Sequence, residues 1–252
     1  MVRSSRSDDS DGPRDPSPSR DGDDRAGIAG VLRGLVWLAF VAAVAVGTVL
    51  YGPALADLVA DDSVPAPSPD PPETGDRNPD ATHPGDPGET AYRTDVETIS
   101  SSSVEDFVHA EVNERRAEHG LDPIEWDGTV ASVSRAHSAD MHERGYFAHV
   151  NPDGEGPYDR FTEVGDYCGV YGENIAKTWV DASVQQPGAN GTVEYLTAEG
   201  VAEGVVDQWM NSTSHRAAIL EADVDGWDRG GVGVYVAEDG TVYATHNFCR
   251  EW

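Results

Sequence analysis

The sequence contains almost no lysine. Lys177 is the one lysine among 17 basic residues, and 46 acidic residues bring the net charge to -29. A charge of this sign repels nucleic acid at long range, so we exclude nucleic acid as a partner. Dense carboxylates with scarcely any lysine suit a protein that works in concentrated salt, where the Debye length falls to a few ångströms. We therefore interpret the acidity as adaptation to a halophilic solvent.

Cysteine is also scarce, and the two thiols belong to Cys168 and Cys249. If they pair, the bridge closes a loop of about 80 residues and stabilises the fold by about 4 kcal/mol in the loop-entropy model. Pairing requires an oxidising compartment, and the alternative is two buried free thiols. The chain orientation derived below favours the disulfide.

Several catalytic signatures are missing. The sequence holds no Gly-x-Ser-x-Gly elbow, no phosphate-binding loop and no dinucleotide-binding glycine fingerprint. Each of these motifs places a nucleophilic serine or a nucleotide phosphate at a turn between a strand and a helix. Their absence argues against a serine hydrolase and against a nucleotide-dependent enzyme.

Long apolar runs are rare, and one stands out near the N-terminus. Residues 34–51 carry no charge and no proline, and with residues 27–32 they reach the length that a bilayer requires. Arg33 interrupts the run where its side chain can reach the interface. We predict one transmembrane helix over 27–51, which makes the membrane itself a partner of the chain.

Basic residues predict the orientation of this anchor. Six arginines occur up to and including Arg33, and no Lys or Arg follows until Arg77. Because basic residues stay on the cytoplasmic side, we expect a cytoplasmic N-terminus and an extracellular C-terminal domain. Residues 1–26 are rich in Asp, Ser, Pro and Arg and are expected to form a disordered tail. The alternative to a retained anchor is a signal peptide cleaved near Ala54–Ala56.

The chain beyond the anchor divides into a linker and one domain. Residues 52–100 are rich in proline and aspartate and are expected to form an extended extracellular linker.

The domain covers residues 101–252. Its apolar spacing predicts helices at 103–120, 129–144 and 198–210, with short helices near 157–164 and 214–220. Two β-like runs, 231–236 and 241–245, flank Glu238-Asp239-Gly240 and predict a hairpin. Long helices followed by a closing hairpin indicate an α+β layered domain.

Short motifs in this domain occur in a recognisable order. They are Asn113–Arg116, Gly120–Asp127, Ala136–Met141, Phe147–His149, Pro152–Gly154, Gly172–Ile175, Trp209–Ser212, His215–Arg216, Ile219–Leu220, Gly231–Val234 and the strand Tyr243–Phe248. In this order the chain resembles the CAP superfamily, the cysteine-rich secretory, antigen 5 and pathogenesis-related group that is also called the SCP domain. The Trp-Met-x-Ser and His-Arg pieces are most similar to its bacterial and archaeal branch. With the acidity, they indicate a halophilic archaeal member.

The resemblance implies an α-β-α sandwich with an open cleft that carries two histidines and two acidic residues. The matching positions are His149, Glu173 in a Gly-Glu-Asn turn, and His215. The second family carboxylate falls at about Ser212, so this sequence departs from the family set. A mechanism that requires two carboxylates is therefore in doubt.

The remaining trio allows more than one chemistry. Two imidazoles, His149 and His215, with Glu173 as ligand or base, form a competent set for zinc or another divalent cation. Alternatively, Glu173 orients a histidine that acts as a general base. Purely structural roles are the other interpretation: a loop hydrogen bond, a helix cap and a first helical turn. Glu203 and Asp207, one or two turns before Ser212, are candidates to replace the missing carboxylate.

Other features receive structural interpretations. His137 lies on an apolar helix stripe and is expected to be a hydrogen-bonded core histidine. His246 lies in the last predicted strand and receives no role. Asn190 and Asn211 head Asn-x-Ser/Thr patterns for glycosylation, and Asn190, in a polar insertion, is the better candidate.

Three functions are compatible with these residues. The first is a surface-displayed module that binds a lipid, glycan or peptide ligand, as the resemblance implies for many members of the superfamily. The second is a metal-assisted, peptidase-like hydrolase that uses His149, Glu173 and His215. The third is a structural or adhesive envelope protein, whose cleft residues would tolerate substitution.

Overall fold

The computed structural model describes residues 65–165, 167–186, 191–222 and 224–251. The expected cytoplasmic tail over 1–26 and transmembrane anchor over 27–51 therefore lie outside the described residues. Among the helices that the structure describes, none combines the length and the hydropathy needed to cross a bilayer.

A four-stranded sheet forms the middle layer of the domain. Its order is β3 (Glu125–Trp126), β7 (Arg229–Val236), β8 (Thr241–Arg250) and β4 (Val170–Trp179). β3 runs parallel to β7, whereas β8 is antiparallel to both of its neighbours, β7 and β4. The predicted hairpin is confirmed as β7–β8, with Gly240 at a φ of 81° in its turn. A second, short hairpin joins β5 (Ser183–Gln185) to β6 (Thr192–Glu194).

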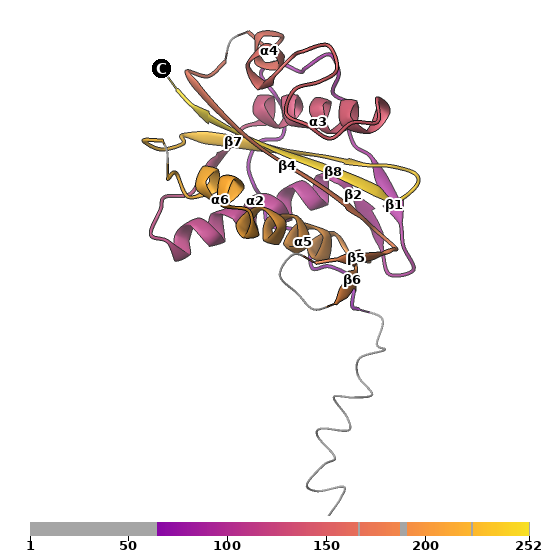
Figure 1. Cartoon of the computed structure of the whole chain (residues 1–252). Helices are drawn as coiled ribbons and strands as arrows, with labels where there is room; N and C mark the ends of the chain where they lie inside the picture. The colour runs from indigo at the N-terminus through magenta and orange to yellow at the C-terminus, as the bar shows by residue number, and fades with distance from the viewer. Residues whose placement is uncertain (1–64, 166, 187–190, 223, 252) are drawn as a thin grey trace, which may run out of the picture. The chain divides into compact units, whose positions relative to one another are not determined.

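Helices cover both faces of the four-stranded sheet (Figure 1). α3 (Gly128–Glu143) and α4 (Pro157–Thr162) lie on one side, and α2 (Ser101–Glu118), α5 (Ala198–Asn211) and α6 (Thr213–Ile219) lie on the other. The predicted helices and the three-layer α+β arrangement are therefore confirmed.

Capping side chains determine where the long helices begin. The Oγ of Ser100 accepts a hydrogen bond from the Ser103 amide, so α2 begins before the expected residue 103. At the start of α3, Asp127 Oδ1 accepts from the amides of Thr129 and Val130. These bonds satisfy amides that have no partner inside the helix.

The helix α3 packs directly on the backbone of β7. A Cβ atom on Gly233 would lie 1.9 Å from the amide nitrogen of Arg135, so only glycine permits this approach. The Oγ of Ser138 donates to the Gly233 carbonyl at 2.8 Å. Gly231 and Ser134 repeat the arrangement two residues earlier along the strand, at 2.7 Å. The two layers are thus joined by hydroxyl-to-backbone bonds as well as by packing.

The apolar core lies mainly between the sheet and the layer of α2 and α5, where Val108, Val205 and Trp209 are fully buried. A smaller cluster on the α3 side contains Cys168 and Cys249. These cysteines form a disulfide with Cα atoms 5.5 Å apart, so the predicted pairing is confirmed. The bridge fastens the loop after α4 to the end of β8.

The segment before α2 packs against the domain from residue 65 onward, which differs from the extended linker expected over 52–100. Arg77 pairs with Glu105 and Asp106 of α2. β1 (Ala91–Arg93) and β2 (Thr98–Ser100) form an antiparallel pair. This segment has no apolar core of its own and is held to the domain by ion pairs and backbone pairing. Its composition alone did not indicate this packing. The compact unit therefore begins well before the expected boundary at residue 101.

Candidate functional site

Glu173 lies on β4, an edge strand of the sheet, opposite Asn247 of β8. The sequence predicted a turn at Gly172-Glu173-Asn174, and that prediction is wrong because these residues continue a ten-residue ladder with β8. The Glu173 side chain is 2% exposed. A buried carboxylate needs charged or hydrogen-bonding partners, and the neighbouring helices and loops supply them.

His149 reaches Glu173 from the loop between α3 and α4. Its Nδ1 lies 2.9 Å from Glu173 Oε1, and its side chain is 47% exposed. The loop is held by Arg160, which donates to the His149 carbonyl at 3.1 Å. Asn151 adds a bond from its amide to the Glu155 carbonyl at 2.9 Å. The imidazole therefore has one end fixed inside the protein and the other facing solvent.

His215 approaches from the opposite helix layer, in the first turns of α6. Its ring centroid lies 6.5 Å from that of His149. Successive residues of a strand point to opposite faces, so Asn174 faces α6 while Glu173 faces α3 and α4. Asn174 Nδ2 donates to the His215 carbonyl at 3.0 Å and so fixes this end of α6. The structure thus brings together all three residues that the sequence analysis singled out, around β4.

Two further residues complete the cluster, and sequence analysis gave neither of them a part in it. Arg160 of α4 donates to Glu173 Oε2 at 2.8 Å, and its side chain is 6% exposed. His137 of α3 is fully buried, as predicted, but its Nε2 also lies 3.7 Å from Glu173 Oε1. The sequence around Arg160, in a six-residue helix, contains no pattern that predicts its role, because its partner Glu173 lies on a strand distant in sequence.

The electrostatics of the cluster favour an ionised Glu173. Burial alone raises the pKa of this carboxyl, but the hydrogen bond from His149 and the charge of Arg160 outweigh it, so the pKa of Glu173 is lowered. Burial is also the main reason why the pKa of His137 falls to about 4, which leaves its ring neutral at neutral pH. Burial and the nearby His149 lower the pKa of His215.

This arrangement assigns the proton of a neutral His149 ring. An ionised carboxylate only accepts hydrogen bonds, so Nδ1 carries the proton that points at Glu173. Nε2 is then free to accept a hydrogen bond or a proton from a bound molecule. Such a carboxylate–imidazole pair is suited both to ligand binding and to general-base chemistry.

Zinc or another divalent cation, one of the alternatives that the sequence allowed, does not fit this arrangement. Both carboxylate oxygens of Glu173 already accept hydrogen bonds, one from His149 and one from the positively charged Arg160. A catalytic zinc site requires three protein ligands. Within the described ranges, no group of three or more His, Cys, Asp or Glu side chains is placed to hold a metal ion. We therefore derive no step through a metal at His149 and His215.

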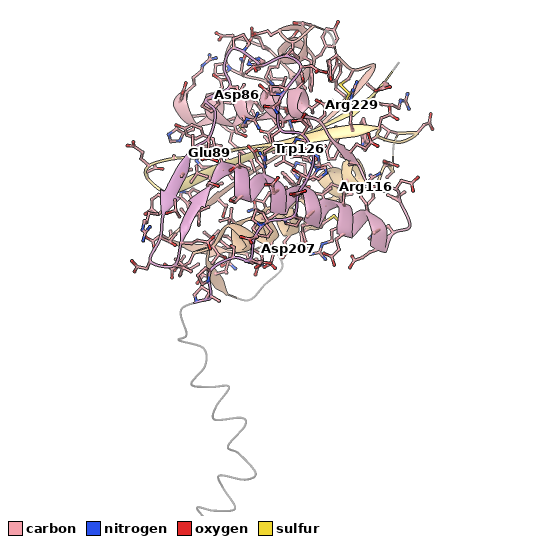
Figure 2. All side chains as sticks on the ribbon, turned by 180° about the vertical axis from the view of Figure 1, so that it is seen from behind. Asp86, Glu89, Arg116, Trp126, Asp207 and Arg229 are labelled. Carbon is pink, nitrogen blue, oxygen red and sulfur yellow. A yellow bond between two sulfur atoms is a disulfide. The ribbon has the colours of Figure 1, made fainter. Side chains whose placement is uncertain are left out.

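The residues considered as substitutes for the missing carboxylate lie elsewhere. Asp207 pairs with Arg115 of α2 at 3.4 Å, and Glu203 lines a cavity between α2 and α5. Figure 2, which views the α2 side, places Asp207 on the opposite side of this helix from Trp126. Ser212 is the residue at which α5 ends and α6 begins. Among the described residues, Glu173 is thus the carboxylate that contacts His149.

Exposed apolar side chains accompany the histidine pair. Phe147 and Val150, which flank His149 in its loop, are 49% and 52% exposed, and Tyr158 of α4 is 55% exposed. Tyr158 contacts Tyr171 of β4, with ring centroids 5.9 Å apart. The loop of His149 and the helix α4 that follows it therefore expose apolar side chains.

The remaining sequence expectations concern residues outside this cluster. Asn211 is exposed at the end of α5, whereas Asn190 lies outside the described residues. His246 is fully buried beside Phe248, with ring centroids 4.1 Å apart, and burial lowers its pKa well below the ordinary value.

Comparison with known proteins identifies relatives of this domain. Residues 109–248 match the model of the cysteine-rich secretory protein family, abbreviated CAP. The chain is similar to the uncharacterized membrane protein YlbC of Bacillus subtilis, with 33% identity over 157 residues that cover 62% of this chain and 36% of that protein. It is also similar to the uncharacterized protein YkwD of the same organism, with 31% identity over 157 residues that cover 61% of this chain and 51% of that protein. The chain therefore spans about half or less of the length of these relatives.

Two solved structures are also similar. An extracellular protein containing an SCP domain from Bacillus anthracis aligns with a TM-score of 0.46 and 27% identity, over 60% of this chain and 41% of that one. An outer surface protein of Borrelia burgdorferi aligns with a TM-score of 0.48 and 19% identity, over 61% of this chain and 97% of that one.

Proposed function

This chain belongs to the cysteine-rich secretory protein (CAP) family, and on that premise we propose that its domain is a ligand-binding module displayed outside the cell. The ligand is an amphipathic molecule of the cell envelope. Its polar group is held by His149 and His215, and its apolar part contacts Phe147 and Val150. The observation that carries the proposal is that two imidazoles from opposite helix layers meet, 6.5 Å apart between ring centroids, and that the loop of His149 also exposes apolar side chains.

The location outside the cell is supported by independent features. The disulfide between Cys168 and Cys249 needs an oxidising compartment to form and persist. The arginine-rich N-terminus and the apolar run over 27–51 favour a retained anchor with its N-terminus in the cytoplasm. The similarity to a protein named as a membrane protein is consistent with such an anchor.

Binding is favoured over metal-assisted hydrolysis because of the state of Glu173. Its two oxygens are engaged by His149 and Arg160, and its side chain is 2% exposed. A carboxylate in this position orients His149, and its burial keeps it from direct contact with a substrate. The groups that a ligand can reach are the imidazole Nε2 of His149, the ring of His215 and the apolar side chains around them.

The proposal is tested with the full chain in lipid nanodiscs and a fluorescently labelled medium-chain fatty alcohol as probe, because its hydroxyl can donate to His149 Nε2. Empty nanodiscs supply the blank. We expect the double variant His149→Ala/His215→Ala to bind the probe about five- to tenfold more weakly, because the hydrogen bond from the hydroxyl to His149 Nε2 and the contact with His215 are lost. The variant Phe147→Ser/Val150→Ser should also weaken binding, because apolar contact area is lost.

The matched control is His119→Ala, since His119 is an exposed histidine at the end of α2. It should leave the affinity unchanged. Equal affinities for the unaltered chain and the double histidine variant would remove His149 and His215 from the binding function. Binding of the labelled alkane analogue, which lacks the hydroxyl, with the same affinity as the alcohol would show that the site does not recognise the polar group.

Hydrolysis without a metal is the second candidate, and the 2.9 Å bond between His149 and Glu173 is the observation that favours it. In that case His149 Nε2 would act as a general base towards water. The test is turnover of ester and peptide libraries by the full chain. Activity that survives chelators and is lost in Glu173→Gln would favour this function, whereas absence of turnover would leave binding as the function of the site.

A further inference from the structure

Lys177 of β4 is the only lysine of the chain, and its ammonium pairs with no carboxylate among the described residues. Most of the described arginines do pair with a carboxylate, as Arg135 does with Asp86 at 3.1 Å. Lys177 instead lies over two aromatic rings. Its Nζ is 4.7 Å from the ring centroid of Tyr243 and 5.3 Å from that of Trp179. Such contacts hold the ammonium in place but leave its charge uncompensated.

A molecule in the solvent can reach this cation. Lys177 is half-buried, and its Nζ is not one of the buried polar atoms. Trp179 is 39% exposed, and Phe147, whose ring centroid lies 6.4 Å from that of Tyr243, is 49% exposed. Lys177 and Trp179 are two residues apart on one strand, so their side chains lie on the same face of the sheet. This face therefore presents a cation beside accessible apolar surface.

The main chain of Lys177 adds a donor and an acceptor at the edge of the sheet. In an antiparallel pair, the main-chain groups of alternate residues face the partner strand, and those of the residues between them face away. The amide of Val180 donates to Gly240 on the β8 side at 2.9 Å, and the amide of Asp181 donates to Tyr195 on the other side at 3.0 Å. Because the register with β8 is continuous, the N–H and C=O of Lys177 face the edge, where no other described residue bonds to them.

These groups together are complementary to a ligand with a carboxylate, hydroxyl groups and an apolar face. We propose that the Lys177 platform, which consists of Lys177 and the exposed ring of Trp179, binds an acidic saccharide. The carboxylate of a uronic acid unit pairs with the ammonium, and its hydroxyls bond to the main-chain N–H and C=O of Lys177. The C–H face of a pyranose ring packs on the indole. The platform includes neither His149 nor His215, so this inference does not depend on the function proposed for them.

The charge of the whole chain does not oppose this contact in concentrated salt. The net charge of -29 repels an acidic ligand at long range. Salt shortens the Debye length to a few ångströms, so this field is screened, whereas a pair in direct contact is screened much less.

An acidic peptide fits the platform less well than a saccharide does. An extended peptide would add to the edge of β4 as a further strand. The place beside Val180 is already taken by Tyr195, which forms a parallel bridge with it. A peptide strand would therefore have to end close to Lys177, whereas a saccharide needs only the platform itself.

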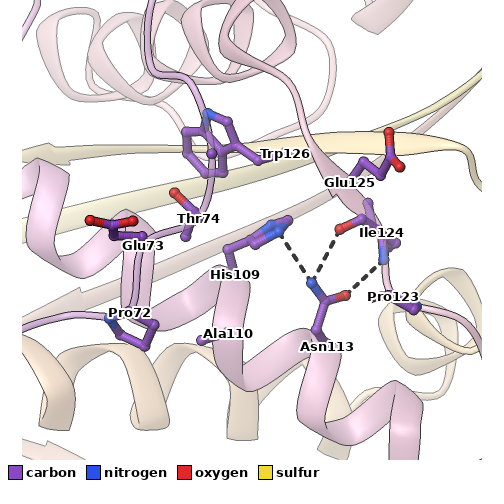
Figure 3. A pocket seen from close by; sticks show the side chains of 11 residues that line it. Pro72, Glu73, Thr74, His109, Ala110, Asn113, Pro123, Ile124, Glu125 and Trp126 are labelled. Carbon is purple, nitrogen blue, oxygen red and sulfur yellow. Dashed lines mark hydrogen bonds between the residues drawn. The ribbon is translucent and has the colours of Figure 1, made fainter.

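The cavity beside the opposite edge of the sheet does not suit an acidic saccharide. It has a volume of about 460 Å³ and lies between α2, β3 and residues 72–75 (Figure 3). The exposed charged groups in its lining are the carboxylates of Glu73 and Glu125, which repel an anion. The amide of Asn113 is used within the protein, since it bonds to both main-chain groups of Ile124. This cavity therefore lacks a cation for the carboxylate.

Calorimetric titration of the full chain in lipid nanodiscs tests the proposal, at the lowest salt concentration in which the chain stays folded. The probes are trigalacturonic acid, its trimethyl ester, and acetyl-Glu-Glu-Glu-amide, which carries as many carboxylates as the acid but no sugar rings. We expect the acid to bind more tightly than the ester and the peptide. Lys177→Gln should weaken binding of the acid about two- to fivefold and leave the ester unchanged, because an ion pair is lost.

Matched variants separate the charge from the apolar contact. Lys177→Arg retains the charge and should keep the preference for the acid over the ester. Trp179→Ser should weaken the acid and the ester by the same factor, since the apolar contact is common to both. The control is Arg93→Gln, because Arg93 is an exposed cation that bonds to Thr98 and, among the described residues, pairs with no carboxylate. It should leave every affinity unchanged.

The double variant His149→Ala/His215→Ala distinguishes this platform from the histidine site. It should bind the acid as tightly as the unaltered chain does, and a loss of binding would place the acid at the histidines instead. Equal affinity for the acid and the ester, tighter binding of the peptide, unchanged affinity for the acid in Lys177→Gln, or no heat with the acid would each overturn the proposal.

Discussion

Arg160 donates a hydrogen bond to Glu173 across 2.8 Å, and the two side chains are 6% and 2% exposed. This pair joins α4 to an edge strand of the sheet and also positions His149, whose carbonyl accepts from the same guanidinium. The geometry of the candidate site therefore depends on a buried ion pair rather than on the loop that carries His149.

Removal of one partner of this pair should destabilise the fold. We expect Arg160→Gln to lower the free energy of unfolding by about 3–5 kcal/mol, because Glu173 is left as a buried charge without its counterion. The measurement is urea-induced unfolding of the full chain, followed by circular dichroism. Adding Glu173→Gln to the Arg160→Gln chain should restore part of the loss, since the buried charge is then removed as well.

Arg144 offers the matched control for this experiment. Its pair with Asp153 at 2.8 Å is largely exposed, with side chains that are 33% and 69% accessible. Arg144→Gln should therefore cost less than about 1 kcal/mol. If Arg160→Gln and Arg144→Gln have equal effects, the buried pair does not stabilise the site.

The second prediction concerns acid. Burial lowers the pKa of His137 and of His109 to about 4, compared with about 6.5 in an unfolded chain. Between these values the unfolded chain binds more protons than the folded one, so stability rises with pH in this window and falls as the pH drops. The lowered pKa of Glu173 adds a loss at lower pH, as its carboxylate becomes protonated.

The contribution of His137 can be isolated by substitution. We expect the difference in unfolding free energy between pH 7 and pH 5 to be smaller by about 2 kcal/mol in His137→Gln than in the unaltered chain. Urea titrations at the two pH values provide the measurement. His119→Gln, which changes an exposed ring, should retain the full difference. An unchanged difference in His137→Gln would mean that this ring is not buried in its neutral form.

Much of the fold was predictable because it depends on local signals. The long helices have apolar stripes and capping residues such as Asp127, and the β7–β8 hairpin has its glycine turn at Gly240. The three site residues could be chosen because the order of short motifs fixes them along the chain. The structure places His149 beside Glu173 and close to His215.

The parts that were not predictable depend on partners distant in sequence. β4 contains Gly172 and Asn174, which favour a turn, and it is extended because β8 supplies a continuous ladder. Arg160 has no local pattern, since its role is defined by Glu173. The segment around Arg77 has the composition of a linker, but pairing with Glu105 of α2 holds it to the domain.

The third prediction concerns the disulfide. Replacement of Cys168 and Cys249 by serine should lower the free energy of unfolding by about 4 kcal/mol, because the unfolded chain is no longer constrained by a closed loop. Thermal unfolding with and without a thiol reductant provides the measurement. The reductant should lower the stability of the unaltered chain and leave the serine variant unchanged. Equal stability of the two proteins without reductant would contradict the prediction.

The last prediction concerns the contact between α3 and β7. A Cβ atom on Gly233 would lie 1.9 Å from the amide nitrogen of Arg135, and neither backbone can move away without loss of the bond from Ser138 to the Gly233 carbonyl. We expect Gly233→Ala to cost about 3 kcal/mol through overpacking, and to lower the melting temperature by roughly 6–12 °C. Gly191→Ala is the control, because a Cβ atom there meets nothing within 4 Å. Equal melting temperatures for the two variants would show that the layers can separate without loss of stability, and that the glycine is not required for the close approach of α3.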